Sequence, residues 1–117
     1  MKGHDAYKRV LNLLGYLNND DLVTSDISLY NRALHAFNQI LLDLKKEEIS
    51  DLSQEINITK AECDALIYGV AMMLSLACGD GERNRIFTDI YNAKRSTVLS
   101  GIDTVSDVMP TTFGGEV

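Results

Sequence analysis

The side chains of this sequence best suited to nucleophilic, acid–base or metal chemistry are His4, His35, Cys63 and Cys78. A metal site needs three or four donors at defined spacing, and no carboxylate or second histidine stands three or four residues after His35. Cys63 is predicted to lie in the first turn of a helix, which lowers a thiol pKa, but a nucleophile also needs a neighbouring base. We therefore expect no enzymatic activity, no metal and no cofactor, and we interpret His35 as a structural or surface residue.

The two cysteines are predicted to share one helix, where fifteen residues separate them. That separation is about 22 Å along a helix axis, whereas a disulfide needs Cα atoms within about 7 Å. We expect both to be reduced thiols in a cytosolic protein, and the same distance excludes a metal held by the pair.

The sequence Gly79-Asp80-Gly81 resembles a fragment of a phosphate-binding loop. A P-loop requires a preceding strand and the spacing GxxxxGK[ST], and neither is found here. A turn between two helices, with Asp80 capping the second, explains the same residues. We therefore expect a helix–helix turn at this position and no nucleotide site.

Charge is distributed unevenly along the chain. Residues 20–64 carry ten acidic and four basic side chains, without the spacing of an EF-hand. We interpret this region as a solvated acidic face, or alternatively as a surface for a basic partner or the lining of a DNA channel. Residues 82–99 have the opposite bias, which would suit a head-to-tail ring, ordinary surface scatter being the alternative. The candidate inter-subunit charges are Arg83, Arg85, Lys94 and Arg95 against Glu47, Glu48 and Asp51.

Composition limits the class of protein. The chain has 117 residues, 45% of them hydrophobic, which suits one small domain. The net charge of −6 argues against non-specific nucleic-acid binding, which favours a basic surface. No apolar run follows the first five residues, and the longest apolar stretch, residues 65–78, is shorter than the roughly 20 residues of a membrane span. We expect neither a secretory signal nor a membrane segment.

Four segments have apolar residues at helical spacing, namely residues 4–17, 27–46, 59–78 and 82–99. They predict an all-α fold, a small four-helix bundle with up to five helices. The third segment is apolar nearly all round, which places it at the centre of the domain. Its short connection to the fourth makes these two helices antiparallel neighbours.

Capping residues mark the predicted helix starts. Asp5 is the expected cap of the first helix and Ser25 or Asp26 that of the second. Thr59 and Glu62 have the spacing of a capping box. Residues 47–58 leave two interpretations open: an irregular connector whose apolar residues pack down as plugs, or a short helical turn.

Residues 101–117 lose the helical pattern but stay too apolar for a solvated tail. Extended, they could span about 55 Å. We divide the chain into a helical domain, residues 1–100, and an extended C-terminal arm, residues 101–117. A groove on another subunit is the expected binding site of this arm, and packing on its own domain is the alternative. Its expected partner-binding residues are Ile102, Val105, Val108, Met109, Pro110 and Phe113.

The order of these features resembles the small head–tail connector proteins (adaptor or head-completion proteins) of tailed bacteriophages and prophages. The resemblance covers mainly residues 59–117. It is carried by the apolar run Leu66–Leu74, by Gly79-Asp80-Gly81-Glu82-Arg83-Asn84, by Ile90-Tyr91-Asn92-Ala93-Lys94-Arg95, and by Asp107-Val108-Met109-Pro110 with Gly114-Gly115.

This resemblance implies a specific role. Such connectors are helical bundles that assemble as a dodecameric ring beneath the portal protein and extend the DNA channel. They present a docking surface to the next neck or tail component, and their C-terminal segment reaches toward the portal or a neighbouring subunit. The implied location is the neck of the virion, after synthesis in the host cytoplasm, and DNA would pass through the ring without sequence-specific binding.

Two other functions remain as alternatives. A small DNA-binding regulator or packaging factor would use Gly79-Asp80-Gly81 as the turn of a helix–turn–helix, with Arg83, Arg85 and Asn92 on the reading helix. The negative net charge argues against it. A tail-completion protein, also structural and viral, is the second alternative.

Overall fold

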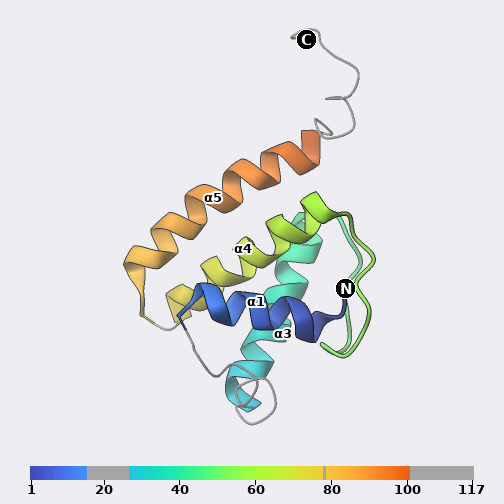
Figure 1. Cartoon of the computed structure of the whole chain (residues 1–117), viewed down its shortest axis with the longest axis horizontal. Helices are drawn as coiled ribbons and strands as arrows, with labels where there is room; N and C mark the ends of the chain where they lie inside the picture. The colour runs from blue at the N-terminus through green and yellow to red at the C-terminus, as the bar shows by residue number, and fades with distance from the viewer. Residues whose placement is uncertain (16–26, 78, 101–117) are drawn as a thin grey trace, which may run out of the picture.

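The computed structural model describes residues 1–15, 27–77 and 79–100. These residues form four helices, α1 (Gly3–Leu13), α3 (Ile27–Asp43), α4 (Lys60–Ala77) and α5 (Gly81–Ser100) (Figure 1). The predicted all-α bundle is therefore confirmed. The predicted arm, residues 101–117, and the expected caps Ser25 and Asp26 lie outside the described residues. Within the described part, no helix is both long and apolar enough to span a membrane.

Helix α4 lies at the centre of the bundle, and α1, α3 and α5 all pack against it (Figure 1). Nine of its eighteen residues are buried. A helix that is apolar on most sides leaves water only when neighbours surround it, so the predicted central position is confirmed. The helices come closest at Gly69, where a Cβ would stand 2.8 Å from Tyr91 and 2.9 Å from Ile40. Gly69 therefore lets both α3 and α5 approach α4.

The first turn of α1 is bonded to the connector between α3 and α4. The backbone N–H of Gly3 donates to the carbonyl of Gln54 at 3.1 Å, and that of His4 to the carbonyl of Leu52 at 2.7 Å. No side chain caps this helix. The prediction that Asp5 caps it is wrong, because connector carbonyls already accept the free N–H groups of the first turn.

Helix α3 ends at Asp43, three residues before the predicted end. Lys45 adopts a positive φ of 63°. The N–H groups of Lys45 and Lys46 then donate to the carbonyls of Leu42 at 3.0 Å and Leu41 at 2.8 Å. This pair of bonds closes a helix around a left-handed residue, and it turns the chain into the connector.

Left-handed glycines follow two other helices. Helix α1 ends at Leu13 and is followed by Gly15 at φ 92°, and α4 ends at Ala77 and is followed by Gly79 at φ 78°. Glycine adopts this conformation without steric cost. The predicted first helix ran to residue 17, and its last two residues lie outside the described part of the chain.

The connector, residues 44–59, has no helix, and its apolar side chains pack into the core. Ile49, Leu52 and Ile56 are buried. The interpretation of an irregular connector with apolar plugs is thus confirmed. Of the alternative, a short helical turn, the structure contains one hydrogen-bonded turn, in which the N–H of Gln54 donates to the carbonyl of Asp51 at 3.1 Å.

The predicted caps of α4 and α5 are confirmed. The N–H of Thr59 donates to Glu62 at 2.8 Å, and the N–H of Glu62 donates to the Thr59 hydroxyl at 3.2 Å, which is the reciprocal pattern of a capping box. At the start of α5, Asp80 accepts from the N–H of Arg83 at 3.0 Å. Figure 1 shows α5 running back alongside α4, as the short turn predicts.

Candidate interaction surfaces

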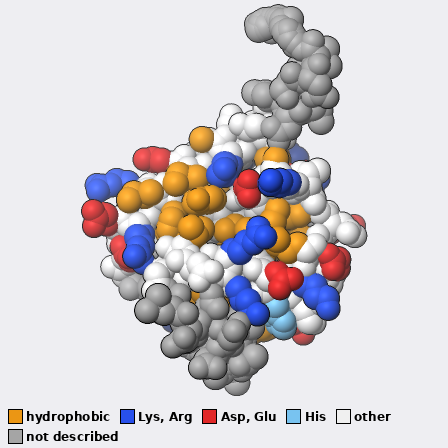
Figure 2. Space-filling model, viewed as in Figure 1, with side chains coloured by type: hydrophobic (Ala, Val, Ile, Leu, Met, Phe, Trp, Pro, Cys, Tyr) orange, Lys and Arg blue, Asp and Glu red, His pale blue; other side chains and the backbone are white. Residues whose placement is uncertain are grey.

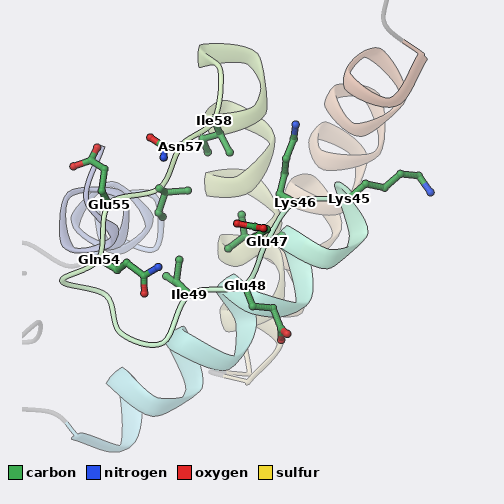
Figure 3. A pocket seen from close by; sticks show the side chains of 11 residues that line it. Lys45, Lys46, Glu47, Glu48, Ile49, Gln54, Glu55, Asn57 and Ile58 are labelled. Carbon is green, nitrogen blue, oxygen red and sulfur yellow. The ribbon is translucent and has the colours of Figure 1, made fainter.

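A hollow of about 340 Å³ lies beside the connector, where the end of α3 faces residues 54–58 (Figure 3). Three carboxylates, Glu47, Glu48 and Glu55, line it together with the apolar Ile49 and Ile56. The carboxylates are exposed and the two isoleucines are buried. Lys45 and Lys46 also line it, so the hollow combines an apolar base with a rim that carries both signs of charge.

Polar side chains of α3 hold the connector in place. The amide of Asn38 donates to the carbonyl of Ile49 at 2.9 Å and accepts from its N–H at 2.8 Å. The Tyr30 hydroxyl donates to Asp51 at 2.5 Å and accepts from the N–H of Leu52 at 3.2 Å. The hydrogen bond from Tyr30 lowers the pKa of the Asp51 carboxyl. Asp51, a candidate inter-subunit charge, is thus already bonded within the chain.

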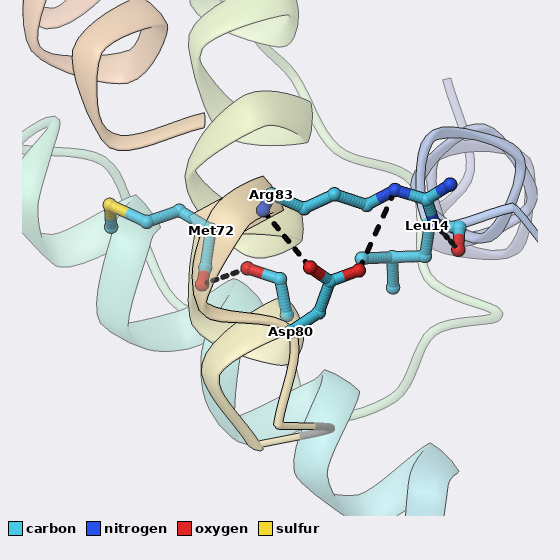
Figure 4. A network of polar contacts seen from close by, with 5 residues as sticks. Leu14, Met72, Asp80 and Arg83 are labelled. Carbon is cyan, nitrogen blue, oxygen red and sulfur yellow. Dashed lines mark hydrogen bonds and ion pairs between the residues drawn. The ribbon is translucent and has the colours of Figure 1, made fainter. Parts of the chain in front are cut away.

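Arg83 ties the start of α5 to the end of α1 (Figure 4). Its guanidinium donates to the carbonyl of Leu14 and forms an ion pair with Asp80 at 3.6 Å. Both partners belong to the same chain, so Arg83 holds the α4–α5 turn against the end of α1. To act also as an inter-subunit charge, Arg83 would have to bind a neighbouring subunit while keeping these two contacts.

Asp43 at the end of α3 is held by two residues of α5. It accepts hydrogen bonds from the Tyr91 hydroxyl and from Arg95 Nε, the latter at 2.6 Å. The bond from Tyr91 lowers the pKa of Asp43, and Arg95 acts in the same direction. Burial first, and then the bond to Asp43, raise the pKa of Tyr91. This cluster links α5 to α3 across the edge of α4.

The remaining candidate charges are distributed between two ends of the molecule. Lys94 lies over the ring of Tyr68, with Nζ 5.4 Å from the ring centroid. Arg85, Glu47 and Glu48 are exposed. The connector that carries the two glutamates and the turn that precedes Arg85 lie at opposite ends of the bundle (Figure 1). The structure thus separates Arg85 from the two glutamates, and it engages Arg83, Lys94 and Arg95 within the chain.

Hydrophobic side chains also gather on the surface between α1 and α5, over α4 (Figure 2). Tyr68 of α4 packs edge-to-face on Phe87 of α5, with ring centroids 6.0 Å apart. Ile86 of α5 leaves 51% of its surface exposed. The inner side of α5, with Phe87 and Tyr91 buried, therefore packs on α4, while Ile86 adds apolar surface beside it.

A second hollow, of about 350 Å³, lies between α3 and the C-terminal half of α4, and we call it the α3–α4 groove. Ala36, Met73 and Leu74 supply apolar surface, and Arg32 and His35 stand at its exposed edge. Its lining within the described part of the chain is Asn31, Arg32, His35, Ala36, Met73, Leu74 and Ala77, and none of these side chains is acidic.

The side chains considered for chemistry are not assembled into a site. Burial raises the pKa of the Cys63 thiol, opposing the lowering that its helical position suggested. Its sulfur lies 3.3 Å from that of Met1. His4 packs against the ring of Tyr30 at 6.2 Å, and His35 is exposed. Among the described residues, no group of three or more His, Cys, Asp or Glu side chains could hold a metal ion.

The expected partner-binding residues of the arm lie outside the described residues, so the structure gives them no position: Ile102, Val105, Val108, Met109, Pro110 and Phe113. Sequence reasoning also missed features that the structure reveals. Asn38 and the Asp43–Tyr91–Arg95 cluster join segments distant in sequence, and no local spacing signals them. The α3–α4 groove likewise combines residues from two helices.

A scan of protein-family models matches no family, and searches of curated proteins and of solved structures find no similar chain.

Proposed function

We propose that this protein is a structural adaptor that works by binding other proteins. In its most specific form, it is a head–tail connector of a tailed phage or prophage, forming a ring between the portal and the tail. This form rests on the resemblance of residues 59–117 to such connectors. The C-terminal arm would attach the folded bundle to its assembly partner.

One observation carries the proposal. The helices and the connector already form one continuous apolar core from described residues. The arm adds six further apolar side chains and a proline to the end of this folded unit. Apolar segments of this kind gain stability by entering a groove of a partner, which supports an assembly role for residues 101–117.

The surface of the bundle gives further support. The acidic connector and the start of α5, with Arg85, lie at opposite ends of the bundle. A head-to-tail contact joins two different surfaces of identical subunits and closes into a ring when the rotation permits. The net charge of −6 would also keep the wall of such a ring from binding DNA tightly as it passes.

Attachment to portal-bearing capsids tests the proposal. Replacing Val108 and Phe113 with serine should abolish attachment while the circular dichroism of the helices stays unchanged, because both residues follow the last described helix, α5. The matched control replaces Thr111 and Thr112, polar residues of the same arm, with serine and should attach normally. Normal attachment of the Val108→Ser/Phe113→Ser variant would contradict the proposal.

The DNA-binding alternative has one favourable feature, the exposed Arg85 and Asn92 on α5. Arg83, the third residue of that hypothesis, is bound to Asp80 and the Leu14 carbonyl instead. Duplex binding that weakens steeply with salt would favour a regulator over the adaptor. A tail-completion role would appear in the same attachment experiment, as binding to tails in place of capsids.

A further inference from the structure

We propose that the α3–α4 groove is the docking site for residues 101–117 of a neighbouring copy of this chain. The inference rests on the proposed function in one respect, because it takes these residues to be a binding segment. It further identifies the partner of that segment, which is a second copy of the chain, and the surface to which the segment binds.

The groove has the chemistry of a site for an apolar segment. Ala36 and Leu74 are almost fully buried and form its base, while Met73 is half-buried and faces it. Methionine adapts its shape to irregular apolar ligands. The occupying segment offers Val105, Val108, Met109 and Phe113 within nine residues.

The α3–α4 groove and the hollow beside the connector differ in the charges that line them. Arg32 and His35 stand at the edge of the groove, and among the described residues no carboxylate lines it. Residues 101–117 contain three acidic side chains and no lysine or arginine. Opposite charges across an interface favour the correct partner and like charges reject it. The connector hollow is lined by Glu47, Glu48 and Glu55 as well as by Lys45 and Lys46, so its charges would attract the acidic segment less.

The geometry favours a neighbouring copy over the same chain. Ala61 and Asp64 of α4 share a hollow with Thr97 and Val98 of α5, so α5 ends beside the start of α4. The groove is formed by residues 73–77 at the other end of α4, roughly 20 Å farther along its axis. Val105, five residues beyond Ser100, reaches at most about 17 Å, so within one chain only later residues such as Met109 and Phe113 could enter the groove, whereas a neighbouring copy can place the whole segment along it. The segment would leave one end of a subunit and bind at the opposite end of its neighbour, which is a head-to-tail contact.

Photo-crosslinking of the full chain identifies the occupant. The photoreactive residue p-benzoylphenylalanine would replace Phe113, and unlabelled protein would be mixed with ¹⁵N-labelled protein before irradiation. We expect products that join a light and a heavy chain, linked at Met73 or its neighbours in the groove. Links confined to single chains, links outside the groove, or no links at all would each overturn the proposal.

A charge reversal tests the rim of the groove. Arg32→Glu should weaken self-association in sedimentation experiments by about ten-fold or more, because it places a carboxylate opposite the acidic segment. Arg9→Glu makes the same change on the exposed side of α1, outside the groove, and should alter self-association less than about two-fold. Adding Asp107→Lys to Arg32→Glu should restore most of the lost affinity. Equal effects of the two arginine variants, or absence of self-association in the unchanged protein, would contradict the proposal.

The two proposals can fail separately. If Arg32→Glu weakens self-association but the unchanged protein never attaches to capsids, the docking site stands and the connector function fails. If capsids bind the protein normally and crosslinks from position 113 reach only the portal, the connector function stands and the α3–α4 groove is not the receptor.

Discussion

Helices α4 and α5 are antiparallel neighbours of similar length, yet they differ sharply in burial. Nine of the eighteen residues of α4 are buried, whereas Phe87 and Tyr91 are the two buried residues of the twenty in α5. Helix α4 is held by apolar packing on most of its sides. Helix α5 relies on one packed side and on polar links, Arg83 to α1 and Arg95 to α3. The interior helix thus organises the fold, and the outer helix presents most of its surface to solvent.

The largest expected effect lies within α4. Leu66→Ala should lower the free energy of unfolding by about 3 kcal/mol, because it leaves a cavity at a fully buried position. Leu76→Ala makes the same change on the same helix, where 66% of the side chain is exposed, and should change stability by less than about 0.5 kcal/mol. Urea denaturation measures both. Similar losses for the two variants would break the distinction between the inner and outer sides of α4.

The difference in stability cost between a buried and an exposed position should be smaller on α5 than on α4. Phe87→Ala should cost about 2 kcal/mol, less than a centrally buried aromatic residue, because α5 is covered on one side. Ile86→Ala, at a neighbouring position that is half exposed, should stay within about 0.5 kcal/mol of the unchanged protein. Thermal unfolding monitored by circular dichroism would compare them. A loss for Phe87→Ala that exceeds that of Leu66→Ala would reverse the ranking of the two helices.

Removing a helix cap should cost α4 and α5 nearly the same stability. Thr59→Ala removes the hydroxyl that caps α4, and Asp80→Ala removes the carboxylate that caps α5. Each should cost about 1 kcal/mol, the usual contribution of a capping side chain. Chemical denaturation of both variants provides the measurement. A cost confined to one of them would show that capping matters to the two helices unequally.

The smallest effect concerns the link from α5 to α3. Tyr91→Phe removes the hydrogen bond to Asp43, whose side chain is 40% exposed, so the loss should be about 0.5 kcal/mol at neutral pH. The folded-state pKa of Asp43 is lowered. The stabilisation is therefore complete above the unfolded pKa of about 3.9 and is lost as pH falls through the lower folded value.

A pH series of unfolding experiments on both proteins checks the sign. The difference between the unchanged protein and Tyr91→Phe should shrink as the pH falls below about 4. Asp43→Asn should remove most of this pH dependence. A difference that grows toward acid would mean that the Tyr91–Asp43 contact does not act through the carboxylate.

Much of the fold could be predicted from local patterns. The all-round apolar character of α4 predicted its central position, and the Thr59–Glu62 spacing predicted its cap. The turn at residues 79–81, with Asp80 as cap, followed from glycine and aspartate preferences. Each of these features depends on residues within a few positions of one another, so sequence spacing is enough to reveal it.

Features that depend on distant partners could not be predicted. The start of α1 was misassigned to an Asp5 cap because its acceptors, the carbonyls of Gln54 and Leu52, lie about fifty residues away. The early end of α3 depends on Lys45 entering a left-handed conformation that lysine rarely adopts. The basic charges of α5 look free in the sequence, but two of them find acidic partners within the chain.

Sequence patterns were enough to predict where the helices form, which of them is interior, and that residues 101–117 are both apolar and acidic. These properties follow from residue type and short-range spacing, which set burial and backbone preference locally. The tertiary structure alone decided which charges are paired, how the connector is pinned by Asn38, and that Arg32, His35 and Met73 border one groove. Such properties depend on which helix faces meet, and packing around α4 decides that only when the whole bundle has formed.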